Sequence, residues 1–164
     1  MAKADLTAER LREILHYDPE TGVFTWRVKA NKRINIGDTA GRINHHGYVV
    51  IGVYGNRWQA HRLAWLYTTG SVPKDQVDHI NGVRSDNRIS NLRDVSGGVN
   101  QQNRRSSQKN NRLGIMGVVS QGSGYMARIR VGGILHRLGT FKTPELAHAA
   151  YLSAKREMHS GSTI

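Results

Sequence analysis

Asp78 and His79 stand side by side at the end of a short apolar run, and their side chains could share one reaction. A carboxylate binds hard divalent cations through oxygen. An imidazole, with an ordinary pKa of about 6.5, is mostly neutral and basic at neutral pH. Adjacent residues on a strand point to opposite faces, so one side chain can hold a metal ion while the other accepts a proton. A buried structural His beside a turn-capping Asp is the alternative that the dipeptide alone leaves open.

Asparagines follow this pair at spacings that place them on separate elements. Asn91 lies twelve residues after His79, and Asn100 lies nine residues further on. The runs QVDHI (76–80) and NLRDV (91–95) each predict a short strand, and the polar residues between them have turn chemistry. A helix through Asn100 would follow. Strand, loop, strand and helix in this order predict a compact ββα unit that brings Asn100 beside the Asp-His pair.

The stretch VDHINGVRSDNRISNLRDVSGGVNQQN (77–103) resembles the HNH, or ββα-metal, nuclease motif. The match is to the phage and intron-homing branch, in which Asn replaces the last His. The upstream stretch GYVVIGVYGNRWQAHRLAWLYTTG (47–70) is also typical of that branch. The resemblance covers roughly residues 5–105.

This resemblance implies a role for each matching residue. Asp78 and Asn100 would ligate one divalent cation, Mg²⁺ or Mn²⁺, through oxygen. His79 would be the general base that takes a proton from the attacking water. Asn91 would be structural, bonding across the loop and orienting the His backbone. Asn103 falls where the family often has another polar helix residue, in a supporting position near phosphate.

Other polar side chains nearby are weaker candidates for chemistry. His61 is expected to pack or to contact phosphate, and catalysis is its less favoured role. His45 and His46 occupy an expected loop, in which a metal site is the less favoured reading. Asp86 and its neighbour Asn87 are expected to cap the turn. As a metal ligand, Asp86 is a weaker candidate than Asn100 because it lies in a loop.

The composition favours a polyanionic partner. The net charge is +12, and a protein that neutralises phosphates gains affinity by counterion release. Residues 104–164 hold 10 Lys and Arg against 2 Asp and Glu, while residues 1–103 hold 14 against 10. The absence of cysteine excludes disulfides and a thiolate zinc site, so no structural zinc is expected, and it fits a reducing cytoplasm. No apolar run is long enough for a membrane span.

The remaining pattern predicts elements that support the two regions. Residues 7–16 predict a helix capped by Thr7, 21–28 a strand, 47–59 a hairpin, and 60–70 a helix that stops at a glycine. After Ser96, a fair N-cap, a helix is expected although Gly97 and Gly98 are poor helix formers.

The C-terminal region predicts three strands and a helix that begins at Pro144. Runs at 115–121, 125–131 and 134–141 are separated by glycine-containing turns. Side-chain alternation would place three arginines on one exposed sheet face, where a small sheet can enter the major groove of DNA. These are Arg128, Arg130 and Arg137, with Arg104 and Arg105 as further DNA contacts ahead of the sheet.

Residues 114–160 resemble the plant ethylene-response-factor DNA-binding domain, which also occurs in phage HNH nucleases. The matching frame is GVVSQGSGYMARIRVGGILHRLGTFKTPELAHAAYLSA (117–154). Tyr125 stands where Trp is usual. Val119 and Gln121 stand where the plant proteins carry base-reading arginines, so the resemblance implies DNA contact without a defined base preference.

These observations predict an α+β protein: an HNH nuclease domain over 1–105, a linker over 106–113, and an ethylene-response-factor-like domain over 114–164. The expected function is metal-dependent hydrolysis of duplex DNA by a monomer or dimer, as a nick or a double-strand cut. The resemblance implies a phage-encoded, homing-like enzyme in the cytoplasm of an infected bacterial host. The alternatives are a DNA-binding protein with a decayed nuclease core and, as a third reading, an RNA-binding regulator.

Overall fold

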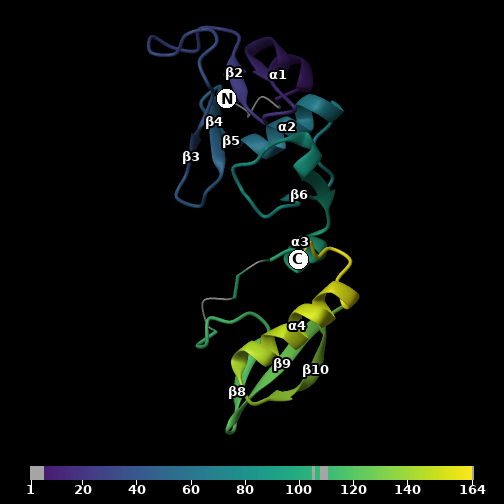
Figure 1. The fold of residues 1–164 in the computed structure, drawn as a ribbon. Helices are drawn as coiled ribbons and strands as arrows, with labels where there is room; N and C mark the ends of the chain where they lie inside the picture. The colour runs from purple at the N-terminus through teal and green to yellow at the C-terminus, as the bar shows by residue number, and fades with distance from the viewer. Residues whose placement is uncertain (1–5, 105, 108–110, 164) are drawn as a thin grey trace. The chain divides into compact units, whose positions relative to one another are not determined.

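The computed structural model describes residues 6–104, 106–107 and 111–163, and the chain divides into two compact units. The first unit is Met1–Val95 and the second is Ser96–Ile164. In the described residues, α-helices of 6 to 15 residues accompany four small antiparallel sheets (Figure 1), so the predicted α+β class is confirmed. Among the described residues, no helix has the length and apolar character needed to cross a bilayer. Each unit has its own hydrophobic core and is described by itself.

The first unit begins with a short helix that leads directly into a strand pair. In α1 (Ala8–Ile14), the Thr7 hydroxyl accepts a hydrogen bond from the Arg10 amide at 3.3 Å, as a helix cap does. β1 (Leu15–Tyr17) then pairs with β2 (Phe24–Trp26). The helix ends earlier than the periodicity predicts because Leu15 and Tyr17 enter the core from a strand instead.

A second sheet and a helix complete the frame of this unit. β3 (Arg42–Ile43), β4 (Val49–Val53) and β5 (Asn56–Gln59) pair in chain order. The β4–β5 turn has positive φ at both Tyr54 and Gly55, the geometry of a two-residue hairpin. α2 (Ala60–Thr69) follows at once and ends at Gly70, which adopts the left-handed conformation.

The predicted strands around the Asp-His pair both form. β6 (Gln76–His79) pairs with β7 (Leu92–Val95), and a 3₁₀ turn, Ile89–Asn91, leads into β7. The Asp94 carboxylate accepts hydrogen bonds from the Lys74 and Asp75 amides at 2.7 and 3.1 Å, which fixes the chain before β6.

The second unit begins with the helix that follows β7. α3 (Gly97–Gln102) is capped by Ser96, whose hydroxyl accepts from the Val99 amide at 3.4 Å. The boundary between the units falls after Val95, so α3 is grouped with the C-terminal residues and not with the β6–β7 pair. The predicted domain ranges, which end the nuclease part at residue 105, stay a prediction.

A three-stranded sheet and one helix form the rest of the second unit. β8 (Val118–Gln121), β9 (Gly124–Val131) and β10 (Ile134–Phe141) pair in the order β10-β9-β8. α4 (Pro144–Met158) crosses one face of this sheet (Figure 1). Its N-cap, Thr143, accepts from the Leu146 amide at 3.3 Å.

Close packing joins α4 to the chain that enters the sheet. Gly117 has φ +77°, and a Cβ there would lie 2.1 Å from the Tyr151 ring, so only glycine fits. The Asn111 amide donates to the Ile115 carbonyl at 2.6 Å, so the end of the predicted linker 106–113 is bonded to this unit. Within the predicted linker, residues 108–110 lie outside the described residues.

Candidate functional site

Asp78 and His79 are both buried at the end of β6. Their exposed fractions are 8% and 4%, which is unusual for an acidic and a basic side chain. The Oδ2 atom of Asp78 accepts from Nη2 and Nε of Arg93 at 2.9 and 3.1 Å. Arg93 is the residue directly opposite Asp78 in the β6–β7 register. This ion pair orients the carboxylate from the neighbouring strand.

The imidazole of His79 is held by a buried amide. Its Nε2 atom lies 3.3 Å from Oδ1 of Asn87, which is 2% exposed. The amide of Asn87 is oriented by a second bond, because its Nδ2 atom donates to the Ser85 carbonyl at 3.2 Å. The group that faces His79 is therefore an acceptor, which assigns the imidazole proton to Nε2. Nδ1 is then the nitrogen that carries the lone pair.

The surroundings of His79 favour its neutral form. Burial lowers its pKa below the ordinary value, and the hydrogen bond to Asn87 and the charges of Asp78 and Asp86 oppose that effect without reversing it. The imidazole is therefore unprotonated at neutral pH. Turn capping was the predicted role of Asn87, whereas the structure places its side chain against the imidazole. No spacing rule in the sequence relates these two residues.

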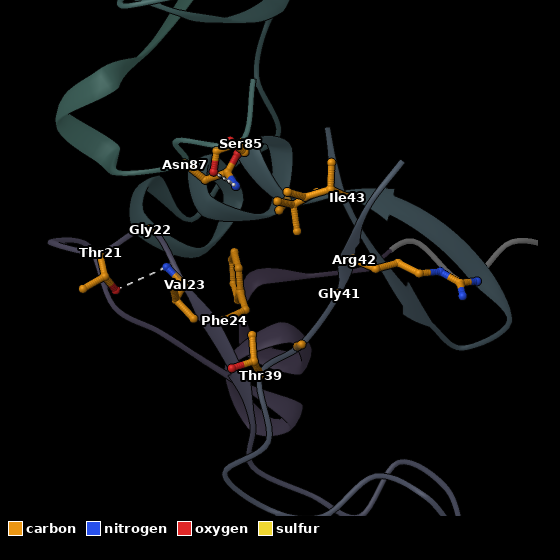
Figure 2. A pocket seen from close by; sticks show the side chains of 13 residues that line it. Thr21, Gly22, Val23, Phe24, Thr39, Gly41, Arg42, Ile43, Ser85 and Asn87 are labelled. Carbon is orange, nitrogen blue, oxygen red and sulfur yellow. Dashed lines mark hydrogen bonds between the residues drawn. The ribbon is translucent and has the colours of Figure 1, made fainter. Parts of the chain in front are cut away.

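The N-terminal part of the unit supports the backbone of Asn87. The Tyr17 hydroxyl donates to the Asn87 carbonyl at 2.7 Å. A Cβ on Gly22, which has φ +72°, would lie 2.5 Å from the backbone of Asn87 and Arg88. Asn87, Ser85 and the segment 21–23 line one cavity of about 200 Å³, which Figure 2 shows from close by. The cavity is smaller than ordinary ligand pockets, and His79 is not among its lining residues.

Asn91 spans the loop between the two strands. It is 6% exposed, its Oδ1 atom accepts from the Asn81 amide at 2.9 Å, and its Nδ2 atom donates to the Asp86 carbonyl at 2.8 Å. The Ile80 amide, next to His79, donates to the Asn91 carbonyl at 2.9 Å. This arrangement agrees with the loop-bridging role that was expected of Asn91.

Asp86 is committed to the turn. Its carboxylate accepts from the Arg88 guanidinium at 2.6 and 2.8 Å and from the Asn81 amide group at 2.7 Å. These bonds, the one from Arg88 first, lower its pKa to about 2. The contacts favour the predicted capping role over metal ligation.

His61 lies against His79, with ring centroids 4.9 Å apart and the rings nearly perpendicular. It is 4% exposed, and its Nδ1 atom has no hydrogen-bond partner among the described residues. Burial first, then the charges of His79 and Arg62, lower its pKa to about 3. A group with so low a pKa is a poor proton acceptor, so these surroundings favour packing over catalysis.

The two remaining predicted helix residues lie in the second unit. Asn100 is half-buried, and its amide donates to the Ser96 carbonyl at 3.0 Å. Asn103 is 5% exposed, and its Oδ1 atom accepts from the Thr163 hydroxyl at 2.5 Å. Burial of Asn103 favours a supporting role over direct phosphate contact. Because Asp78 and Asn100 belong to different units, the ββα arrangement and a shared metal site stay predictions.

The donor chemistry of Asp78 and Asn100 suits Mg²⁺ or Mn²⁺. One carboxylate oxygen and one amide oxygen are hard ligands of the kind these ions prefer. Within the described ranges, no group of three or more His, Cys, Asp or Glu could hold a metal ion, and this includes the neighbourhood of His45 and His46. Two protein ligands would leave the rest of the coordination shell to water and substrate.

The outer face of the C-terminal sheet is basic. Arg128 and Arg137 are exposed and lie directly opposite each other in the β9–β10 register. Arg130 is also exposed, and its guanidinium donates to the Gly133 carbonyl at 2.5 Å in the hairpin turn. Like charges opposite each other destabilise a sheet, so this face is better satisfied by an anion. Arg104 is exposed as well, whereas Arg105 lies outside the described residues.

Part of the chain matches a known family. Residues 59–102 match the family model described as HNH endonuclease. An HNH domain is present. The match covers α2, the β6–β7 pair and α3, and it includes Asp78, His79, Asn91 and Asn100. No curated protein and no solved structure matches the chain. The C-terminal sheet lies beyond the matched HNH residues.

Proposed function

We propose that this protein is a metal-dependent endonuclease that hydrolyses phosphodiester bonds of duplex DNA. The observation that carries the proposal is the matched HNH segment, in which buried His79 is kept neutral beside the carboxylate of Asp78. A neutral imidazole can accept a proton from water, and a carboxylate can hold a divalent cation.

His79 acts in this proposal as the general base. Its Nε2–H donates to Asn87, so the basic Nδ1 atom takes the proton from the attacking water. The burial that lowers its pKa also keeps it unprotonated at neutral pH. Asn87 restrains the rotation of the ring, and Asn91 holds the backbone after it through the Ile80 amide and the Asn91 carbonyl.

Asp78 and Asn100 would hold the cation, Mg²⁺ or Mn²⁺. A divalent ion bound there would supply positive charge beside the scissile phosphate. Arg93 orients the Asp78 carboxylate for this role through two bonds to Oδ2. Asn103 supports the end of α3, one turn beyond Asn100.

DNA binding follows from the charge and its distribution. The net charge is +12, and three exposed arginines share the outer face of the β8–β10 sheet. The likeness of this unit to the ethylene-response-factor domain supports a duplex DNA partner, as does its sheet-on-helix fold. The phage origin, the homing role and the host cytoplasm rest on the resemblance alone. The resemblance does not choose between monomer and dimer or between a nick and a double-strand cut.

A plasmid cleavage assay tests this function against a non-cutting DNA-binding protein. Supercoiled plasmid is incubated with the protein in Mg²⁺, in Mn²⁺, and in EDTA. We expect open-circular or linear product only with a divalent ion. A protein that shifts plasmid in a gel but leaves it supercoiled with both ions would instead have a decayed nuclease core.

The substitution His79→Ala tests the assignment of the base. We expect it to lower the cleavage rate by about 10²–10⁴-fold, the usual contribution of general base catalysis. DNA binding should persist, because the basic sheet lies in the other unit. His45→Ala, an exposed histidine in the same unit, is the control. Cleavage by His79→Ala at the wild-type rate would contradict the assignment.

A further inference from the structure

The helix that carries Asn100 is too weak to be stable alone. α3 has six residues, and it begins with Gly97 and Gly98. Isolated helices of this length do not persist in water, and glycine is among the poorest helix formers. None of its residues is fully buried. The position of Asn100 must therefore depend on contacts that α3 makes with other parts of the protein.

The C-terminal tail supplies such contacts on one side of α3. The Gly161 amide donates to Oε1 of Gln102 at 2.9 Å. A Cβ on Gly161 would lie 2.6 Å from the Val99 carbonyl oxygen and 2.7 Å from its Cγ1 atom. Such distances occur in essentially no real structure, so the tail backbone lies directly on α3 only because residue 161 is glycine. The Thr163 hydroxyl extends the contact by donating to Oδ1 of Asn103.

A lysine of α4 bonds to the chain just beyond the C-terminal end of α3. Lys155 is 1% exposed, and its Nζ atom donates to the Arg104 carbonyl at 2.6 Å. Arg104 lies two residues after Gln102, the last residue of α3, and a cation near the C-terminal end of a helix is stabilising. Burial of a lysine costs free energy, so a fully buried one in this place marks a specific contact.

We propose that residues 159–163 and Lys155, here called the C-terminal strap, position Asn100 for metal binding by holding α3. The inference rests on the proposed function, in which Asn100 is a metal ligand. In this proposal the strap residues act through α3 and not on the cation, so they are positioning residues. The unit that carries the basic sheet thereby also sets the place of a metal ligand.

Gly161→Ala is the sharpest perturbation, because the added methyl collides with Val99. Gly52→Ala is the matched control: Gly52 has an ordinary φ, and a Cβ there meets nothing within 4 Å. Thr163→Val is a milder variant that removes one donor and keeps the shape. All are made in the full chain. Hydrogen exchange of residues 97–103 is measured without metal, and the Mn²⁺ concentration for half-maximal plasmid cleavage is measured separately.

Gly161→Ala should exchange the amides of α3 about tenfold faster, as overpacking of this size predicts. It should also raise the Mn²⁺ requirement about tenfold, the effect usual for residues that support a metal ligand. Thr163→Val should shift both quantities in the same direction by less. Gly52→Ala should change both by no more than about twofold.

If Gly161→Ala changes neither the exchange of α3 nor the Mn²⁺ requirement, the proposed role of the strap is wrong. If exchange is faster but the Mn²⁺ requirement stays at the wild-type value, the strap does not position the metal ligand, and the proposal is also wrong. Protection of β9 in the same exchange data reports whether the unit stays folded; if it does not, Thr163→Val decides. If wild-type protein fails to cut at any Mn²⁺ concentration, the proposed function fails. The exchange result then still shows whether the strap holds α3, and with it whether this part of the inference stands.

Discussion

Two imidazole rings and one amide pack together at the end of β6. His79 is bonded to Asn87 at its Nε2 atom and packed edge-to-face on His61. The Tyr48 ring lies against both, with its centroid 5.3 Å from that of His61 and 6.0 Å from that of His79. Each of these contacts restricts how the His79 ring can turn. A general base must be held within hydrogen-bond reach of its water, so restriction of this kind serves the proposed reaction.

The pH dependence of stability should report the burial of His61. Its folded pKa, about 3, lies below its ordinary value of 6.5, so the unfolded chain binds the proton more readily. Stability is therefore lost as the pH falls below about 6.5. His61→Phe keeps a ring in place and removes the titration. We expect the wild type to lose about 2 kcal/mol more than this variant between pH 6.5 and pH 5.

Urea unfolding at both pH values measures this difference. His45→Phe is the matched control, because His45 is exposed. Equal losses of stability in wild type and His61→Phe would mean that His61 is not kept neutral by the fold.

Spacing in the sequence was enough to select Asp78, His79, Asn91 and Asn100 as candidates, since the family pattern is carried by residue types. It did not relate Asn87 to His79, or Arg93 to Asp78. Those pairs depend on the path of the loop and on the strand register, and both are set by tertiary contacts. The hydrogen bonds of Asn87 and Arg93 became visible only with the fold.

At the scale of elements, the β1–β2 hairpin supports the loop that holds His79. Its turn places Gly22 on the backbone of Asn87, and Tyr17 at the end of β1 donates to the Asn87 carbonyl. The N-terminal hairpin is therefore part of the support of the candidate base, although it lies before the residues that match the HNH family.

Gly22→Ala should disrupt this support, and Gly37→Ala is its matched control. Both glycines have positive φ, but a Cβ on Gly37 meets nothing within 4 Å. The backbone strain common to both should cost roughly 1–2 kcal/mol. Gly22→Ala should cost about 1–3 kcal/mol more, because its methyl overlaps backbone atoms. Unfolding free energies measure this, and equal losses in the two variants would argue against the close contact.

Most elements were predictable because their signals are local. Thr7 and Thr143 mark helix starts because their hydroxyls cap the first turn, and Gly70 marks a helix end because it has no side chain. The structure confirms all three. Helix 7–16 was predicted too long, since apolar periodicity cannot show that Leu15 pairs with Trp26 across two strands. The contacts of α3 with the tail were not predicted either, because they join residues about 60 positions apart.

At the scale of the whole molecule, charge and chemistry are distributed over two units. The buried Asp-His pair lies in the first, while the exposed arginine face lies in the second together with α3. If the proposed function holds, catalysis needs groups from both units, and the C-terminal unit does more than tether the enzyme to DNA.

Removal of one arginine from the sheet face should weaken DNA binding in a salt-dependent way. Arg137→Ala is expected to lower the affinity and to reduce the slope of log K against log salt by about 1, the value for one lost phosphate contact. Arg156→Ala removes the same charge from an exposed position on α4 and should leave the slope unchanged. Binding titrations at several salt concentrations measure both slopes. An equal slope in the two variants would mean that net charge, and not this face, drives binding.

The most direct test of the account is the Mn²⁺ dependence of plasmid cleavage by Asp78→Ala and Asn100→Ala. Gln101→Ala, an exposed neighbour on α3, is the control. We predict that each of the first two variants raises the Mn²⁺ concentration for half-maximal cleavage by about tenfold or more, or abolishes cleavage. Gln101→Ala should match the wild type. If Asp78→Ala or Asn100→Ala cuts with the wild-type Mn²⁺ requirement, the two residues do not hold one catalytic metal ion.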